Sequence, residues 1–423
     1  AKVTDDRVMP GVTSYAGFIT AKGQYADLRN HLFFWYVEPA IPPSKGERLP
    51  LIVWLQGGPG GSSLFGMWSE TGPYQLDLDL NLHKRSASWT ERHAVLYIDN
   101  PVGTGFSFSE TDSYVSNAKV EAAGQLHSIL EQFFTMFDLH DSADLWIAGE
   151  SYGGHWVPAL SHFTATEIDK GASRLPLRGL AIGNGWVDPV NQIKAYPSLL
   201  FDLALISYTE RQVIQEYCDQ AIDFIERDRP GDAFRVWDAM INGDLLPEGE
   251  FPLVRQFTGL QNYFNYLLDV EPAVDNAFSD FVQLPFVRKA IHVGDRPFGA
   301  TAKQVEDNLR DDFMVSFRGE VEDLLDTGRK VLIYNGQLDV IINMATTRAF
   351  LERLEWAGRS RYEDENQQVW RTSKDSPRVA GYIKQSCNLT TAVVRNAGHM
   401  VPTDQPEAAL DLISRFIRGQ PFD

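Results

Sequence analysis

The sequence predicts an α/β fold built on a mostly parallel central sheet that is flanked by helices. Short apolar runs with the composition of buried strands occupy residues 51–55, 94–98, 145–148, 177–182, 331–334 and 391–394. Amphipathic helical patterns follow at residues 120–133, 156–163, 345–354 and 408–416. Strands that alternate with helices at this spacing are typical of parallel α/β sheets.

The strand pattern stops between residues 190 and 325. Helical patterns at 197–206 and 208–225 replace it, and residues 243–259, rich in Gly, Pro and charge, are expected to form an exposed loop. The chain of 423 residues is long enough for one large domain with an insertion. We therefore expect a sheet core formed by 1–189 and 326–423, with a mostly helical cap inserted at 190–325.

Composition narrows the classes of partner and of site. The net charge of −19 argues against nucleic acid or an anionic membrane as partner. No apolar segment is long enough to span a bilayer, and no basic and apolar leader opens the chain, so a signal peptide was either removed or never present. Two cysteines, Cys218 and Cys387, form one bridge or remain free thiols. Asn388 begins an N-glycosylation acceptor pattern.

The most informative local motif is Gly149-Glu150-Ser151-Tyr152-Gly153, which reads G-x-S-x-G directly after an apolar run. A strand that turns sharply into a helix needs small residues on both sides of the turn, and it exposes the serine hydroxyl at the sheet edge. The alternative is a chance string in a glycine-rich chain. The strand before it and the amphipathic run behind it favour Ser151 as a nucleophile.

A serine nucleophile needs a base, and the base needs an orienting carboxylate. Asp339 and His399 follow the apolar runs 331–334 and 391–394, at the ends where parallel sheets build their sites. Their order after Ser151 is the order expected for this arrangement. Two competing histidines, His155 and His292, are interpreted as structural, and Asp404 as the N-cap of the last helix.

A glycine-rich loop, Gln56-Gly57-Gly58-Pro59-Gly60-Gly61-Ser62-Ser63, follows the first strong strand. Its backbone can approach a ligand closely, so the N–H groups of Gly58 and Tyr152 are candidates for an oxyanion hole. A phosphate-binding loop is disfavoured, because both its Lys-Ser/Thr ending and a G-x-G-x-x-G spacing are missing. No histidine-pair spacing suggests a metal, and we expect neither a metal nor a cofactor.

Together these segments resemble the serine carboxypeptidases, a family with the α/β-hydrolase fold. The resemblance rests on 54–63, 149–154, 334–339 and 398–402, with residues 99–107 in the same pattern. It runs from about residue 15 to 416 and is nearest to the vitellogenic-like carboxypeptidase branch, close to lysosomal protective protein and yeast vacuolar carboxypeptidase.

The resemblance implies a role for each matching residue. Ser151, Asp339 and His399 match the triad, and Gly58 and Tyr152 match the oxyanion hole. The residues that match those holding the substrate's C-terminal carboxylate are Gln56, Gly57, Glu70 and Glu150. Gln56 departs from the family's asparagine, while Gly61 and Ile342 stand where cysteines are common. Met400, beside the base, suggests an apolar pocket on the leaving side.

The implied function is a serine exopeptidase that cleaves the C-terminal peptide bond of peptides and proteins through an acyl-enzyme. Two close carboxyls retain a proton, so Glu70 and Glu150 should bind a carboxylate best in acid. This points to a lysosomal, vacuolar or secreted protein. The alternatives are an acyltransferase, a hydroxynitrile lyase or an esterase on the same scaffold, or a partner-binding role without catalysis. The oligomeric state is open, a homodimer included.

Overall fold

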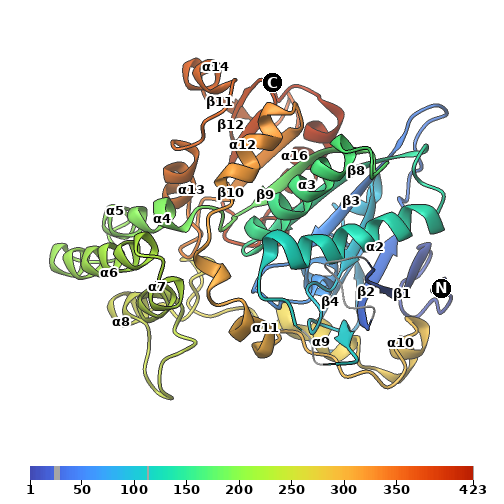
Figure 1. Cartoon of the computed structure of the whole chain (residues 1–423), viewed down its shortest axis with the longest axis horizontal. Helices are drawn as coiled ribbons and strands as arrows, with labels where there is room; N and C mark the ends of the chain where they lie inside the picture. Colours follow the sequence, from blue (N-terminus) through green and yellow to red (C-terminus); the bar gives the residue numbers. More distant parts are fainter. Residues whose placement is uncertain (23–28, 112–113, 423) are drawn as a thin grey trace.

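The computed structural model describes residues 1–22, 29–111 and 114–422, and within these ranges eleven strands form one sheet. The sheet order is β1-β2-β6-β3-β8-β9-β10-β13-β12-β11, with β7 paired to β2 (Figure 1). The strands are β1 (Ser14–Thr20), β2 (Asn30–Val37), β3 (Leu49–Leu55), β6 (Ala94–Ile98), β7 (Phe108–Ser109), β8 (Ala143–Glu150), β9 (Leu177–Gly183), β10 (Lys330–Gly336), β11 (Gln368–Trp370), β12 (Gly381–Ser386) and β13 (Leu389–Val394). The central strands from β6 to β13 run parallel, which confirms the predicted α/β class.

Every strand predicted from an apolar run is present and belongs to the parallel centre of the sheet. The prediction missed the antiparallel strands at both edges. β1 and β12 mix polar and apolar residues and are only partly buried, which weakens their signal. β2 carries the same buried apolar run as the core strands, and the sequence prediction omitted it.

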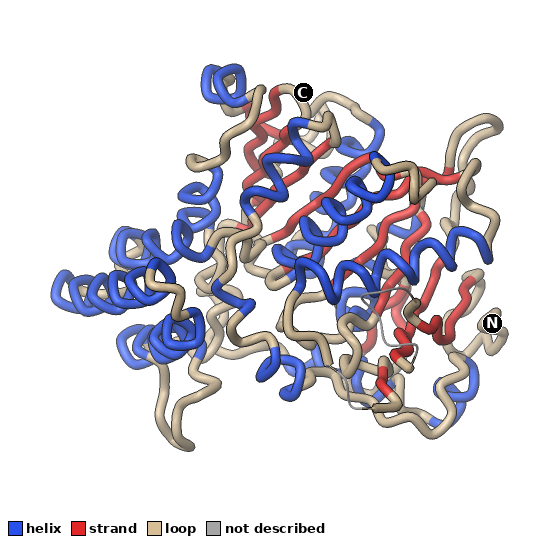
Figure 2. The backbone as a smooth tube through the Cα atoms, viewed as in Figure 1, coloured by secondary structure: helices blue, strands red, loops and turns tan. Residues whose placement is uncertain are grey.

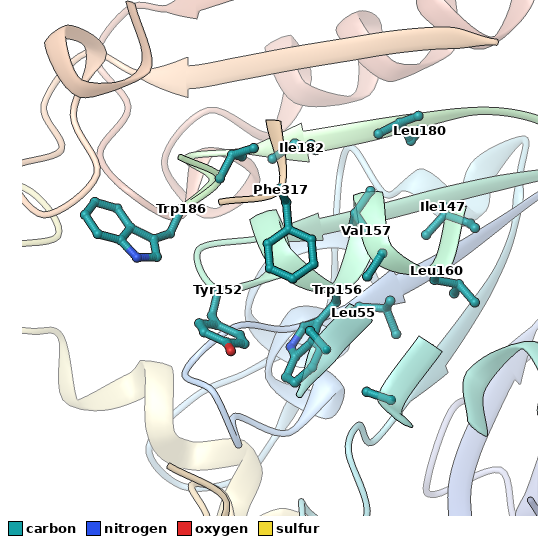
Figure 3. Close-up of a cluster of buried hydrophobic side chains, with 14 of the residues drawn as sticks. Leu55, Ile147, Tyr152, Trp156, Val157, Leu160, Leu180, Ile182, Trp186 and Phe317 are labelled. Atoms are coloured by element: carbon teal, nitrogen blue, oxygen red, sulfur yellow. The ribbon is translucent and has the colours of Figure 1, made fainter. Parts of the chain in front are cut away.

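Helices cover both faces of the sheet. Helices α2 (Ala123–Met136), α3 (Gly153–Asp169) and α12 (Arg318–Asp326) lie on one face, and α16 (Pro406–Arg418) covers the other (Figure 1). Side chains of β8 alternate between the two layers: Ile147 packs with Val157 and Leu160 of α3 (Figure 3), whereas the Trp146 ring lies 5.4 Å from Phe416 of α16. The core is therefore divided by the sheet into two apolar layers.

The elements described between β9 and β10 are all helical. They are α4 (Pro189–Gln192), η4 (Ile193–Ala195), α5 (Tyr196–Asp202), α6 (Tyr208–Glu226), α7 (Pro230–Trp237), η5 (Asp238–Asn242), α8 (Leu253–Thr258), η6 (Ala273–Asn276), α9 (Ala277–Phe281), α10 (Pro285–Ala290), α11 (Lys303–Asn308), η7 (Asp312–Met314) and α12. In Figures 1 and 2, helices α5 to α8 lie beyond the left edge of the sheet. Helix α12 instead packs on the sheet against α3 and β10.

Two local expectations are corrected by the structure. The exposed loop expected at 243–259 contains helix α8, whose Val254 is buried against the core. The helix expected at 197–206 ends at Asp202, since Ala204 takes a left-handed φ of 56°. Of the two alternatives for the cysteines, the structure shows free thiols and no bridge: Cys218 is buried and Cys387 is exposed.

Candidate active site

Ser151 lies at the turn between β8 and α3, where the backbone is strained. Its φ is 61°, a left-handed value that a serine rarely adopts. The turn is held because Ser151 N–H donates to Gly183 O at 3.2 Å and Trp186 N–H donates to Ser151 O at 2.9 Å. A Cβ on Gly57 would lie 2.5 Å from the Ser151 Cβ, so only glycine allows the neighbouring loop to approach this closely.

His399 and Asp339 form a buried hydrogen-bonded pair. His399 Nδ1 lies 2.7 Å from Asp339 Oδ2, and the two residues are 2% and 1% exposed. The contact requires the proton on Nδ1, which leaves Nε2 as an acceptor. Nε2 is buried and has no partner among the described residues, and His399 lines the same cleft as Ser151. No hydrogen bond joins the two side chains within the described part of the chain. His399 therefore offers an unpartnered acceptor nitrogen at the cleft, as its candidate role as the base requires.

Asn184, which the sequence argument missed, holds the carboxylate of Asp339, the candidate acid of the triad. Its Nδ2 donates to Asp339 Oδ2 at 2.6 Å, while its Oδ1 accepts from Gly336 N–H at 3.1 Å. Ile342 N–H donates to the other carboxylate oxygen at 3.2 Å. Asn184 follows β9 with φ of 42°, and an asparagine in a left-handed turn after a core strand was a signal that could have revealed it.

The turn that carries His399 is braced by two polar contacts. His399 N–H donates to Phe264 O at 2.7 Å, and Asp404 accepts from Gly398 N–H at 2.6 Å. Asp404 also accepts from Asn265 Nδ2 at 3.0 Å. The predicted N-cap role for Asp404 is wrong, because Asp404 ends the short helix α15 (Val401–Asp404). The N-cap position of helix α16 is occupied by Gln405, whose side chain makes no capping hydrogen bond.

The two competing histidines lie elsewhere. His155 is fully buried beneath Tyr152, with Nδ1 3.4 Å from Asp312 Oδ2. His292 follows α10, and its Nε2 lies 3.3 Å from Lys2 O. Neither residue lines the cleft that holds Ser151.

The two candidate oxyanion donors come from different elements. Gly58 has φ of 111°, and Tyr152 precedes the first turn of the 17-residue helix α3, whose N-terminus favours negative charge. Neither backbone N–H has a hydrogen-bond partner in the described ranges. Asp99 fixes the glycine loop, accepting from Ser62 Oγ at 2.6 Å and Ser63 N–H at 3.1 Å. Burial raises the pKa of Asp99 to about 6.

Gln56 has a fixed amide orientation. Trp54 Nε1 donates to Gln56 Oε1 at 2.8 Å, so Gln56 Nε2 is directed to Glu150 Oε1 at 3.2 Å. The glutamine that departs from the family's asparagine thus bridges a buried indole and the glutamate before Ser151. Trp54 is a further residue that the sequence argument did not single out.

Glu70 and Glu150 form a buried acidic pair. Glu70 comes from the π-helix η1 (Gly66–Thr71), and the two glutamates are 0% and 1% exposed. Burial raises the pKa of Glu70 to about 7. Burial, and then the negative charge of Glu70, raise the pKa of Glu150 well above its usual range. Among the described residues, both oxygens of Glu70 and Oε2 of Glu150 have no geometric hydrogen-bond partner. In acid, the pair is protonated and can donate.

Most of the predicted site residues line one cleft of about 370 Å³. Asp339 and Glu70 do not line it, and Asp339 reaches it through its contact with His399. The core side supplies Gln56, Gly57, Gly58, Glu150, Ser151, Tyr152, His399 and Met400, and the insertion supplies the aromatic rings of Phe234, Trp237, Tyr263, Phe264 and Phe313. In the described part of the chain, no cluster of three or more His, Cys, Asp or Glu is placed to hold a metal, and no helix is long and apolar enough to cross a membrane.

A nucleophile turn, an Asp–His pair and a glycine loop at the ends of parallel strands define an α/β hydrolase. The family model for serine carboxypeptidases matches residues 5–419, and the chain belongs to that family. It is a serine-type carboxypeptidase, a peptidase whose substrates are peptides.

Curated relatives match almost the whole chain. The venom serine carboxypeptidase of Apis mellifera is 39% identical over 99% of this chain and 87% of its own length. The probable serine carboxypeptidase CPVL of Homo sapiens is 38% identical over 98% and 85%. The vitellogenic carboxypeptidase of Aedes aegypti is 37% identical over 97% and 84%. These matches confirm the expected branch.

One solved structure shares the fold closely. The prohormone-processing carboxypeptidase Kex1(Δ)p of Saccharomyces cerevisiae superposes with a TM-score of 0.82 at 24% identity, covering 96% of this chain and 92% of that one. This likeness confirms the α/β-hydrolase architecture.

Proposed function

We propose that this carboxypeptidase releases single residues from peptide and protein C-termini through an acyl-enzyme, and that it works best in acid. Ser151 Oγ attacks the last peptide carbonyl while His399 Nε2 takes its proton. The N–H groups of Gly58 and Tyr152 stabilise the oxyanion. His399 then protonates the leaving amine, and water hydrolyses the ester on Ser151. Met400 lies in the cleft beside His399, where it fits an apolar leaving residue.

The observation that carries this proposal is the hydrogen bond from Gln56 to Glu150, immediately before the nucleophile and backed by buried Glu70. An ordinary esterase has no need for acidic groups here. Below about pH 7, Glu70 and Glu150 are neutral and can donate to a substrate carboxylate. As pH rises through the pKa of Glu70, the pair gains negative charge and repels that carboxylate.

The pH dependence of KM should differ between free and blocked substrates. For a peptide with a free C-terminal carboxylate, KM should rise steeply above about pH 7, because Glu70 ionises there. A matched substrate with a blocked C-terminus, such as an ester, should keep its KM through neutral pH. In Glu70→Gln/Glu150→Gln both side chains stay neutral, so the rise for the free acid should disappear. Steady-state kinetics between pH 4.5 and 8 give both curves.

Two results would contradict the glutamate mechanism. One is an equal pH response of the free-acid and blocked substrates in the wild type. The other is an unchanged rise of KM in the double glutamine variant. Rapid turnover of the ester with no cleavage of free peptides at pH 5 would favour the esterase alternative.

We further propose that the protein is lysosomal, vacuolar or secreted; an acidic lumen suits its glutamate pair, which is fully neutral below about pH 7. Imaging of a tagged protein against compartment markers tests this, and light scattering tests for a homodimer.

The geometry of Asn388 weighs against glycosylation at this residue. Its Nδ2, the atom that would carry a glycan, donates to Leu325 O and to Arg329 O, both at 2.7 Å.

A further inference from the structure

A buried carboxylate from the insertion reaches the residue next to the nucleophile. Asp312 lies in the short 3-10 helix η7 and is 5% exposed. Its Oδ2 accepts the phenolic O–H of Tyr152 at 2.6 Å, across 160 residues of sequence. The Tyr152 backbone N–H is at the same time one of the two candidate oxyanion donors. Tyr152 therefore connects the cap insertion to the candidate oxyanion hole.

The carboxylate has donors at both oxygens. Oδ1 accepts from Ala118 N–H at 3.2 Å, and Oδ2 also lies 3.4 Å from Nδ1 of His155. Burial lowers the pKa of His155, and a proton on Nδ1 allows this nitrogen to donate to Asp312. A side chain with this set of donors is confined to one position, so the Tyr152 hydroxyl is confined as well.

The segment that carries Asp312 is itself fastened to the sheet core. Trp186 Nε1 donates to Phe313 O at 2.8 Å, and Phe317 N–H donates to Val187 O at 2.8 Å. The Phe313 ring stacks on Tyr152 with centroids 5.4 Å apart. Figure 3 shows Tyr152 within this apolar cluster, with Trp186 and Phe317 nearby. Tyr152 is thus held by its ring as well as by its hydroxyl.

We propose that Asp312 is a positioning residue for the oxyanion hole, acting through the phenol of Tyr152. Ser151 is strained at φ of 61°, and the peptide unit that follows it is held at its carbonyl, where Ser151 O accepts from Trp186 N–H at 2.9 Å. Asp312 adds a second anchor to this peptide unit, through the Tyr152 side chain and without touching the substrate. The inference rests on the proposed function, since it assumes that Tyr152 N–H stabilises the oxyanion.

The test compares Tyr152→Phe, Asp312→Asn and the double variant. Tyr152→Phe keeps the ring and removes only the anchored hydroxyl. Each variant should lower kcat about 10- to 100-fold, since small misplacements at a reacting centre have effects of this size. KM should change less than about twofold, because ground-state binding uses other groups. The double variant should lose no more kcat than the less active of the two single variants, since both substitutions act on the same hydrogen bond between Tyr152 and Asp312.

A peptide aldehyde provides a readout that general destabilisation would not reproduce. It forms a bond from its carbonyl carbon to Ser151 Oγ as the C=O π bond breaks, which places the resulting oxyanion in the hole while His399 takes the serine proton. Its inhibition constant should rise by the same factor by which kcat/KM falls. Asp411→Asn is the matched control, because Asp411 accepts from the indole of Trp370 at 2.8 Å, on helix α16 and outside the cleft.

Folding is checked by circular dichroism and melting temperature. A folded Tyr152→Phe variant with wild-type kcat and aldehyde affinity would overturn the inference. So would a double variant whose fold-loss of kcat equals the product of the fold-losses in the two single variants. A wild-type protein that cleaves neither free nor blocked substrates would overturn the proposed function itself, and this inference with it.

Discussion

At the residue scale, the site depends on amide side chains that orient carboxylates. Asn184 donates to Asp339 at 2.6 Å, and Gln56 donates to Glu150 at 3.2 Å. Each amide is itself fixed by a second hydrogen bond, from Gly336 N–H to Asn184 and from the Trp54 indole to Gln56. Such supporting contacts keep catalytic groups in the geometry that the reaction needs.

Asn184→Asp should lower kcat about 10- to 100-fold on free and blocked substrates alike, because a second carboxylate would face Asp339 and displace it from His399. Asn191→Asp is the matched control, since Asn191 donates to Asp188 at the same 2.6 Å outside the cleft. Kinetics at pH 5, with melting temperatures for both variants, measure the difference. Equal losses of kcat in the two variants would show that Asn184 has no specific role.

At the element scale, the start of α3 fixes where the nucleophile lies. Gly154, in its first turn, lies against the backbone of the loop after β9, and a Cβ there would come within 2.5 Å of Trp186 O. This close approach brings the Ser151 turn next to Asn184. Gly319, at the equivalent position of α12, has no atom within 4 Å of an added Cβ.

Gly154→Ala should destabilise the protein by about 1–3 kcal/mol, because the methyl group overpacks against rigid backbone. It should also reduce kcat by pushing α3 away from the loop. Gly319→Ala should be neutral or slightly stabilising, since alanine favours the helix and meets no obstacle. Denaturant unfolding and kinetics on both variants test this pair. A Gly154→Ala protein as stable as Gly319→Ala would refute the predicted clash.

At the scale of the whole molecule, buried carboxyls couple stability to pH. Burial raises the pKa of Glu70 from 4.5 to about 7 and that of Asp99 from 3.8 to about 6. In these intervals the unfolded chain loses protons that the folded protein keeps, so stability falls as pH rises. The net charge of −19 acts in the same direction, because repulsion grows as carboxyls ionise.

The melting temperature should therefore be higher at pH 5 than at pH 7.5. In the Glu70→Gln/Glu150→Gln variant, the melting temperature should fall less steeply as pH rises, because two of the titrating groups are gone. Differential scanning calorimetry between pH 4.5 and 8 measures both slopes. A wild-type melting temperature that climbs toward neutral pH would contradict the raised pKa values.

Local patterns in the sequence were enough to predict the parallel strands, the residues at their ends and the family. An apolar run marks a buried strand, and G-x-S-x-G marks the turn after it. The sequence also suggested that Glu70 and Glu150 act together, but only through the resemblance to a family. Strands β1 and β12 and helix α8 were missed because their local signals are weak or mixed, whereas β2 has a strong apolar run and was simply omitted.

The groups that support the site could be identified only in the folded chain. The hydrogen bonds from Asn184 to Asp339 and from Tyr152 to Asp312 join residues 155 and 160 positions apart, and no local pattern encodes such contacts. Asp404 has the local pattern of an N-cap, yet the folded chain uses it to brace the His399 turn. The raised pKa of Glu70 likewise depends on its complete burial, which exists only once the sheet, the π-helix and the insertion have come together.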